Sequence, residues 1–294
     1  MTVPHDWAIY GPFSSLNDKQ EVAISQDGQK EAMEHAGRTG GLPFVGVGWY
    51  RTEFDVPQFQ AGKRATILFD GAMSHANVYI NGQKVGYWPY GYNSFHFDIT
   101  KYLKPGEKNT LAVRLENLPE SSRWYPGAGL YRNVHLIITE DAYIPVWGTY
   151  ITTPSVNEKF AKVNVRTKVV LPEGADPAKY SVETSVWNPN KQKLTAVRTS
   201  LAQMKYNNNQ AEQEFVIQAP SLWSPEMPAL YSAETRLYEG DKLKDIYTTP
   251  FGIRSIEIIP DKGFFLNGKR TVFKGVCNHH DLGPLGAAVN DAAI

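Results

Sequence analysis

The chain has 294 residues, of which 42% are hydrophobic and 12% aromatic, and its 30 Lys and Arg residues balance 30 Asp and Glu residues. This length allows about two domains, and the composition can bury real cores, which excludes a disordered chain. A net charge of zero gives no attraction to nucleic acid or to an anionic membrane, and no apolar run reaches the roughly 18 residues of a membrane span. A single cysteine, Cys277, excludes an intrachain disulfide.

The first 140 residues contain many short runs that are typical of β-strands. After Pro4-His5-Asp6-Trp7 and a polar, loop-like stretch, aromatic and β-branched residues become frequent from Trp49 onward. Asn81-Gly82 lies between two such runs and is a strong hairpin signal. Many strands with almost no helix predict a β-sandwich that ends near residue 140. The predicted strands are residues 49–56, 65–70, 76–80, 94–99, 110–117 and 131–139.

A second β unit follows. Apolar and polar residues alternate along residues 163–169 and 231–237, and further strands are predicted at 180–187, 194–201 and 211–218. About seven strands in roughly 110 residues fit an immunoglobulin-like sandwich. Because one cysteine cannot form the inter-sheet disulfide, this likeness concerns the architecture alone.

The last part of the chain is too short for a domain of its own. Residues 255–259, 263–266 and 271–276 are predicted strands, with Asn267-Gly268 as a turn. About 40 residues cannot bury an independent core of this kind. This part therefore reads as the beginning of a further domain.

One loop combines a cation with flat rings. Arg123, Trp124 and Tyr125 stand directly before Pro126-Gly127-Ala128-Gly129. Proline fixes φ and glycine permits a positive φ, so a rigid loop is expected. Aromatic faces beside hydrogen-bond donors suit a sugar ring, whereas the alternative is a packed turn between two strands.

Several motifs along the whole chain resemble those of glycoside hydrolase family 2, the β-galactosidase, β-glucuronidase and β-mannosidase group. They are Pro4-His5-Asp6-Trp7, Gly48-Trp49-Tyr50-Arg51, Phe69-Asp70-Gly71-Ala72, residues 78–82, Gly91-Tyr92-Asn93-Ser94-Phe95, residues 123–132, Leu222-Trp223-Ser224-Pro225, Phe251-Gly252-Ile253-Arg254, residues 264–269 and residues 274–279. Each motif is weak alone, but together they occur in the family's order.

The resemblance implies three parts. Residues 1–141 would form a jelly-roll sugar-binding domain, residues 142–252 an immunoglobulin-like β-sandwich, and residues 253–294 the incomplete start of a (β/α)₈ catalytic barrel. In that scheme residues 271–276 resemble the first barrel strand, and residues 277–281 the loop at its C-terminal end, where the active sites of such barrels lie.

No catalytic residue is assigned. A retaining glycosidase needs two carboxylates about 5–5.5 Å apart, and in this family both come from later barrel strands, the acid/base following an Asn. No Asn-Glu pair follows Asp281, and Asn157-Glu158 falls in the second domain. The chain alone is therefore predicted to be inactive on glycosides.

The predicted substrate-binding residues are Arg123, Trp124, Tyr125 and His279. The resemblance directs the loop of the first three toward the barrel's pocket, and His279 aligns with a family histidine near the sugar. Arg123 stands where well-known β-galactosidases offer a carboxylate, which puts galactose specificity in doubt. The arginine would instead meet an acidic or substituted sugar, or brace a domain interface; for His279 the alternative is packing or capping at a strand end.

No metal site or cofactor is assigned within the chain. His279, His280 and Asp281 are adjacent, so their side chains alternate between faces and make a poor ligand set. Family members often use Mg²⁺ or Na⁺, and the resemblance implies ligands beyond Ile294. His5-Asp6 is expected to have a structural role.

The leading hypothesis is the N-terminal, non-catalytic part of a retaining, β-galactosidase-like enzyme that hydrolyses terminal β-glycosidic bonds. Its partners would be a carbohydrate and the missing catalytic barrel, with no nucleic acid or membrane. One alternative is a stand-alone carbohydrate-binding protein, and another is a structural tandem of sandwiches that assembles a homo-oligomer. The location is unassigned; the periplasm or secretion is suggested by exported relatives and by a start that resembles signal-peptide removal.

Overall fold

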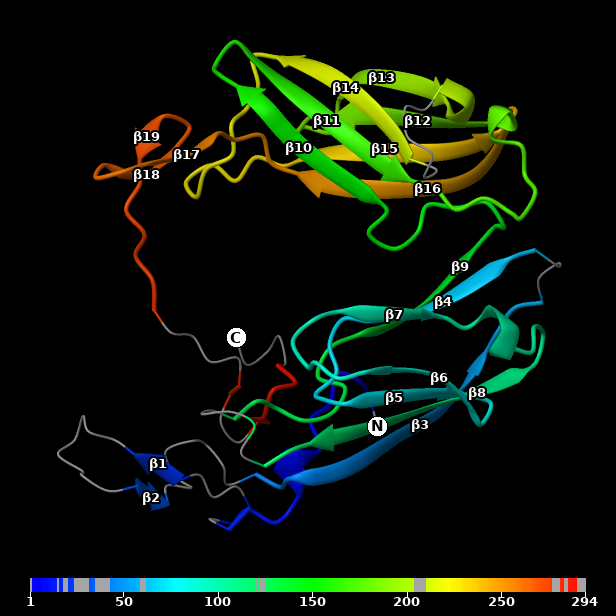
Figure 1. Cartoon of the computed structure of the whole chain (residues 1–294), viewed down its shortest axis with the longest axis vertical. Helices are drawn as coiled ribbons and strands as arrows, with labels where there is room; N and C mark the ends of the chain where they lie inside the picture. Colours follow the sequence, from blue (N-terminus) through cyan, green and yellow to red (C-terminus); the bar gives the residue numbers. More distant parts are fainter. Residues whose placement is uncertain are drawn as a thin grey trace. The chain divides into compact units, whose positions relative to one another are not determined.

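The computed structural model describes residues 2–14, 16–17, 21–23, 32–34, 43–58, 62–119, 121, 125–203, 210–276, 281–282 and 285–289 (Figure 1). The chain divides into two compact units. Unit 1 comprises Met1–Ile138 together with Cys277–Ile294, and unit 2 comprises Thr139–Val276. The regular secondary structure of the described part of both units is almost entirely β-strand, which confirms the predicted all-β class.

Unit 1 is a two-sheet sandwich. One sheet has the order β3-β8-β5-β6, formed by Gly46–Asp55, Lys108–Asn117, Ala76–Ile80 and Gln83–Trp88; the other has the order β7-β4-β9, formed by Phe95–Asp98, Arg64–Phe69 and Val134–Thr139. A separate pair is β1 (Glu21–Ala23) with β2 (Ala32–Glu34), and two short 3₁₀ helices are η1 (Ala8–Tyr10) and η3 (Thr100–Tyr102).

Alternation along β8 produces the core of this sandwich. Leu111, Val113 and Leu115 point inward and are buried, while the residues between them face outward. They pack against residues of the facing sheet, among them Phe69 and Phe95, whose rings stack at 4.8 Å. Burial of each such side chain contributes about 1.5–3 kcal/mol, so this apolar face holds the two sheets together.

The predicted Asn-Gly hairpin is present between β5 and β6. Asn81 and Gly82 have φ values of 50° and 79°, as a tight hairpin turn requires. The Asn81 side chain also donates to the Asn109 Oδ1 atom at 2.8 Å and accepts from the Thr110 amide at 2.9 Å. Asparagine therefore both permits the turn and joins it to β8.

Unit 2 contains the predicted immunoglobulin-like sandwich. Its seven strands form one sheet of order β10-β11-β14 and another of order β13-β12-β15-β16. Two buried clusters fill it, one around Val163, Val165 and Phe215 and the other around Val182 and Leu237. The strands are Thr149–Val156, Phe160–Lys168, Tyr180–Trp187, Lys193–Ser200, Gln210–Gln218, Tyr231–Glu239 and Lys242–Phe251 for β10 to β16, with η4 at Pro177–Lys179 and η5 at Leu201–Gln203.

A small sheet ends unit 2. It has the order β17-β18-β19, formed by Ile256–Ile259, Gly263–Leu266 and Lys269–Arg270, and Asn267-Gly268 makes its predicted turn. The predicted strand at 271–276 is wrong: after Thr271, whose amide donates to the Phe264 carbonyl at 2.9 Å, these residues are irregular. A barrel strand depends on hydrogen bonds to strands on both sides, and no described strand pairs with residues 272–276.

Candidate functional site

A buried carboxylate lies where several of the recognised motifs of unit 1 meet. Asp6 is 1% exposed and accepts hydrogen bonds from three donors in three parts of the chain. The Tyr125 hydroxyl donates to both carboxylate oxygens, at 2.9 and 2.7 Å, while the Ala8 amide donates at 3.0 Å and the Ala287 amide at 2.8 Å. These donors replace the hydrogen bonds to water that the carboxylate loses on burial.

Packing of the first residues on β3 fixes the position of Asp6. The ring of Trp7 lies directly against Gly48, where even a Cβ atom would overlap it. Ala8 begins η1 and packs with Tyr125 and Ala128 under the same ring. The Pro4–Trp7 and Gly48–Arg51 motifs are therefore two sides of one contact.

Tyr125 is buried in this arrangement. Its side chain is 8% exposed, and burial, with the neighbouring Asp6 charge as the next cause, raises the pKa of its hydroxyl above the ordinary range. Asp281 also lies close enough to raise this pKa. The hydroxyl thus stays protonated and donates to Asp6.

His5 and Tyr50 form a second contact beside Asp6. The Tyr50 hydroxyl donates to the His5 carbonyl at 3.1 Å and lies 2.8 Å from His5 Nδ1, while the imidazole stacks on Tyr10 at 5.3 Å. Burial raises the pKa of Tyr50 to about 12 and lowers the pKa of His5 below its ordinary 6.5. Because the hydroxyl proton is used by the carbonyl, the tautomer with its proton on Nδ1 fits this contact.

The segment 285–289 covers the other side of Asp6. Gly286 has a φ of 70°, and a Cβ atom on it would lie 2.6 Å from an Asp6 oxygen. Ala287 is buried in a cluster with Met73 and Tyr131. The C-terminal residues of unit 1 are therefore packed onto the sandwich through the carboxylate.

The structure describes only one of the predicted substrate-binding residues. Tyr125 lies in the Asp6 contact, and its hydroxyl points to that carboxylate. Arg123, Trp124 and His279 lie outside the described residues. Sequence reasoning missed that Asp6 connects Tyr125 to Ala287; the one available signal was a carboxylate inside an apolar motif.

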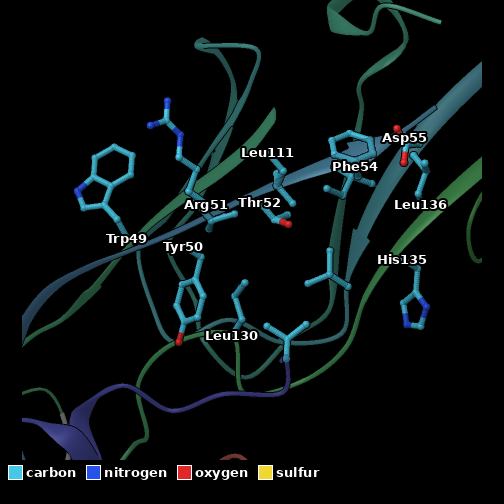
Figure 2. A pocket seen from close by; sticks show the side chains of 14 residues that line it. Trp49, Tyr50, Arg51, Thr52, Phe54, Asp55, Leu111, Leu130, His135 and Leu136 are labelled. Carbon is cyan, nitrogen blue, oxygen red and sulfur yellow. The ribbon is translucent and has the colours of Figure 1, made fainter. Parts of the chain in front are cut away.

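A cavity of ≈ 610 Å³ opens between the edges of the two sheets of unit 1. Its walls are largely apolar and include Leu111, Leu130 and Leu136, with His135 at one end (Figure 2). Figure 2 shows Trp49 and Arg51 projecting from β3 on the side opposite to Tyr50. The alternation of β3 thus gives Tyr50 to the sandwich interior and Trp49 to its outer face.

The outer face of that sheet carries a row of polar and aromatic side chains. Register places Trp49, Arg114, Asn77 and Tyr87 opposite one another across all four strands. Trp49 is 59% exposed and Tyr87 45% exposed. Strands lie about 4.8 Å apart, so the row spans about 14 Å, the length of two or three sugar rings.

No three His, Cys, Asp or Glu side chains among the described residues are grouped so that they could hold a metal ion. In the same part of the chain no helix is long and apolar enough to cross a membrane.

Comparison with known proteins gives the same family in both units. Residues 42–140 match the sugar binding domain of the glycosyl hydrolases family 2, and residues 143–254 match the glycosyl hydrolases family 2 itself. A β-galactosidase of Bacteroides ovatus is 41% identical over 100% of the chain, which covers 32% of that protein. A β-glucuronidase of Bacteroides fragilis is 34% identical over 83% of the chain and 36% of its own length.

A solved structure agrees. A family 2 member from Bacteroides cellulosilyticus superposes with a TM-score of 0.84 at 33% identity, and the match covers 100% of this chain and 36% of that one. The chain thus spans about a third of the length of the relatives it matches.

Proposed function

Because the chain belongs to glycoside hydrolase family 2, we propose that it is the sugar-binding and immunoglobulin-like part of a retaining β-glycosidase whose catalytic carboxylates lie outside these 294 residues. The observation that carries the proposal is the Asp6 contact. It holds Tyr125, which directly follows Arg123 and Trp124, together with the segment that follows His279. The chain would then supply two walls of a sugar pocket and leave bond cleavage to carboxylates about 5–5.5 Å apart elsewhere.

Arg123, Trp124 and His279 are proposed to contact the sugar, with Tyr125 as the anchor of their loop. A guanidinium pairs well with a carboxylate, so Arg123 favours an acidic sugar over galactose. Relatives of both kinds, a β-galactosidase and a β-glucuronidase, match this chain. Any Mg²⁺ or Na⁺ would be held by residues outside the chain.

The test uses the complete gene product and the 294-residue chain in parallel. We expect the chain alone to release no aglycone from an aryl β-glucuronide or aryl β-galactoside, and the complete protein to cleave at least one. In the complete protein, Arg123→Ala should raise KM for the preferred acidic substrate about 10- to 100-fold, the value of one charge-assisted hydrogen bond. Arg132→Ala, which removes an exposed arginine beside the Tyr131 ring, is the matched control. Turnover by the chain alone would refute the assignment.

The row on the outer sheet face favours a second candidate, a carbohydrate-binding protein that acts without a barrel. Trp49 contacts Tyr79 at 5.7 Å, and the His75 Nδ1 atom lies 2.6 Å from the Tyr87 hydroxyl, so aromatic faces are fixed beside Arg114 and Asn77. Such a surface suits sugar rings, which have an apolar face and a rim of hydroxyls.

Calorimetry with oligosaccharides separates the two candidates. The second candidate requires saturable binding by the chain alone that Trp49→Ala weakens at least about 10-fold, a loss of about 1.4 kcal/mol. Trp147→Ala, at a comparably exposed tryptophan of unit 2, should change nothing. If the chain shows no binding, the second candidate is excluded and the first stands.

A further inference from the structure

Asp6 joins segments that are far apart in the sequence. Its partner atoms in Tyr125 and Ala287 are separated from it by 119 and 281 residues, while the Ala8 amide is a local partner. The local bond spans two residues and involves only the first amide of η1. The other two donors, the Tyr125 hydroxyl and the Ala287 amide, each hold a distant chain segment against the same carboxylate.

The two long-range bonds depend on each other physically. A carboxylate removed from water is costly unless hydrogen-bond donors replace that water. Segment 285–289 supplies one such donor and also shields the carboxylate from solvent, because the Ala287 amide donates to Oδ2 and Gly286 lies directly over the same oxygen. If this segment leaves, water reaches Asp6 and competes with the Tyr125 hydroxyl for it.

We propose that Asp6 is the positioning residue of the sugar pocket, a shared anchor through which the Tyr125 loop and segment 285–289 are ordered together. The coupling is a property of this chain. Its consequence for a sugar rests on the proposed function, since Tyr125 and segment 285–289 adjoin the residues proposed to contact that sugar.

Three variants act on different parts of the anchor. Asp6→Asn keeps the shape but has one oxygen, and since the Ala8 and Ala287 amides bond to different oxygens, its NH₂ group must face one of these N–H donors. Tyr125→Phe removes the hydroxyl alone. Gly286→Ala acts only in the C-terminal segment, by placing a methyl group against Asp6 at a φ that disfavours alanine.

Hydrogen exchange on the 294-residue chain tests the coupling without any substrate. Peptides covering residues 125–131 and 281–289 are followed. Gly286→Ala should accelerate exchange about fivefold or more in both peptides, although the sequence of residues 125–131 is unchanged. Tyr125→Phe should likewise accelerate exchange in residues 281–289, whose sequence that variant leaves unchanged. Asp6→Asn should accelerate both at once.

The matched control is Asp245→Asn in unit 2. Asp245 is a partly buried carboxylate, and it accepts from the Ile144 and Ile246 amides at 2.8 Å each. Its replacement should leave both peptides as in the wild type. Acceleration by Gly286→Ala in residues 281–289 alone would show two independent contacts and overturn the proposal. Should Asp6→Asn fail to fold by circular dichroism, the other two variants decide.

The complete protein then tests the effect on sugar. Tyr125→Phe and Gly286→Ala should raise KM for an aryl glycoside about 5- to 10-fold with kcat changed less, whereas Asp245→Asn leaves KM unchanged. If exchange in the two peptides is coupled but the complete protein cleaves no glycoside, the proposed function is wrong and the coupling through Asp6 stands. Turnover with uncoupled exchange, or with unchanged KM in both variants, would sink the positioning role.

Discussion

His5 and Asp6 are neighbours in the chain, and the fold treats their charges in opposite ways. Asp6 receives hydrogen bonds from three donors in the interior, whereas burial lowers the pKa of His5, an effect that the adjacent Asp6 charge only partly offsets. The partly buried His5 imidazole, which lies beside the Tyr50 hydroxyl, is therefore favoured in its neutral form.

This lowered pKa predicts a loss of stability in acid. The unfolded chain binds a proton at His5 near pH 6.5, while the folded chain binds it only at lower pH. The stabilisation is thus complete above 6.5 and declines as the pH falls below it, until the folded histidine also titrates. Urea unfolding of the wild type and of His5→Asn from about pH 7.5 to about pH 5 should show a steeper decline for the wild type. Parallel curves would contradict the assignment; His96, also shifted downward by burial, is common to both proteins.

The residues of the anchor show what a sequence can reveal about a site. Composition and order identify the aromatic loop, and Tyr125 is in it. They do not identify Asp6 as its partner, because the contact spans 119 residues and depends on how Trp7 packs on Gly48. Long-range polar contacts leave no periodic pattern, so only the fold reveals them.

At the scale of elements, the same reasoning explains which strands are predictable. β5 and β12 are predicted at their observed bounds; burial alternates along all of β5 and along the first half of β12. The strands that alternation does not locate, β10 and β16, lie at the edges of their sheets, and their exposure is irregular. The irregular exposure is the reason, and the edge position alone is not, because β14 is also an edge strand and alternates regularly.

Turns are predictable for a different reason. Asn81-Gly82 and Asn267-Gly268 both form the expected turns because a positive φ restricts the choice of residue locally. The failed prediction at 271–276 marks the limit of this approach. A strand of a parallel barrel is specified by its neighbours, and an apolar run alone does not specify them.

At the scale of the whole molecule, the described chain has separate cores. The cluster around Leu115 contains residues of unit 1 alone, and the clusters of unit 2 contain none of them. Leu115 and Leu237 are both fully buried, one in each unit. Two cores without shared side chains should unfold as two cooperative transitions.

Calorimetry on a matched pair of variants tests this independence. Leu115→Ala and Leu237→Ala each remove the same group from a filled core and should cost about 2–5 kcal/mol. We expect Leu115→Ala to lower the melting temperature of one transition and Leu237→Ala that of the other, each leaving the second transition within error. The Asp6 variants should follow Leu115→Ala, because Asp6 and all its donors belong to unit 1. A single transition that shifts equally in both leucine variants would instead mean that the two sandwiches unfold cooperatively. The hydrogen bonds of Asp6 would then contribute to the stability of both.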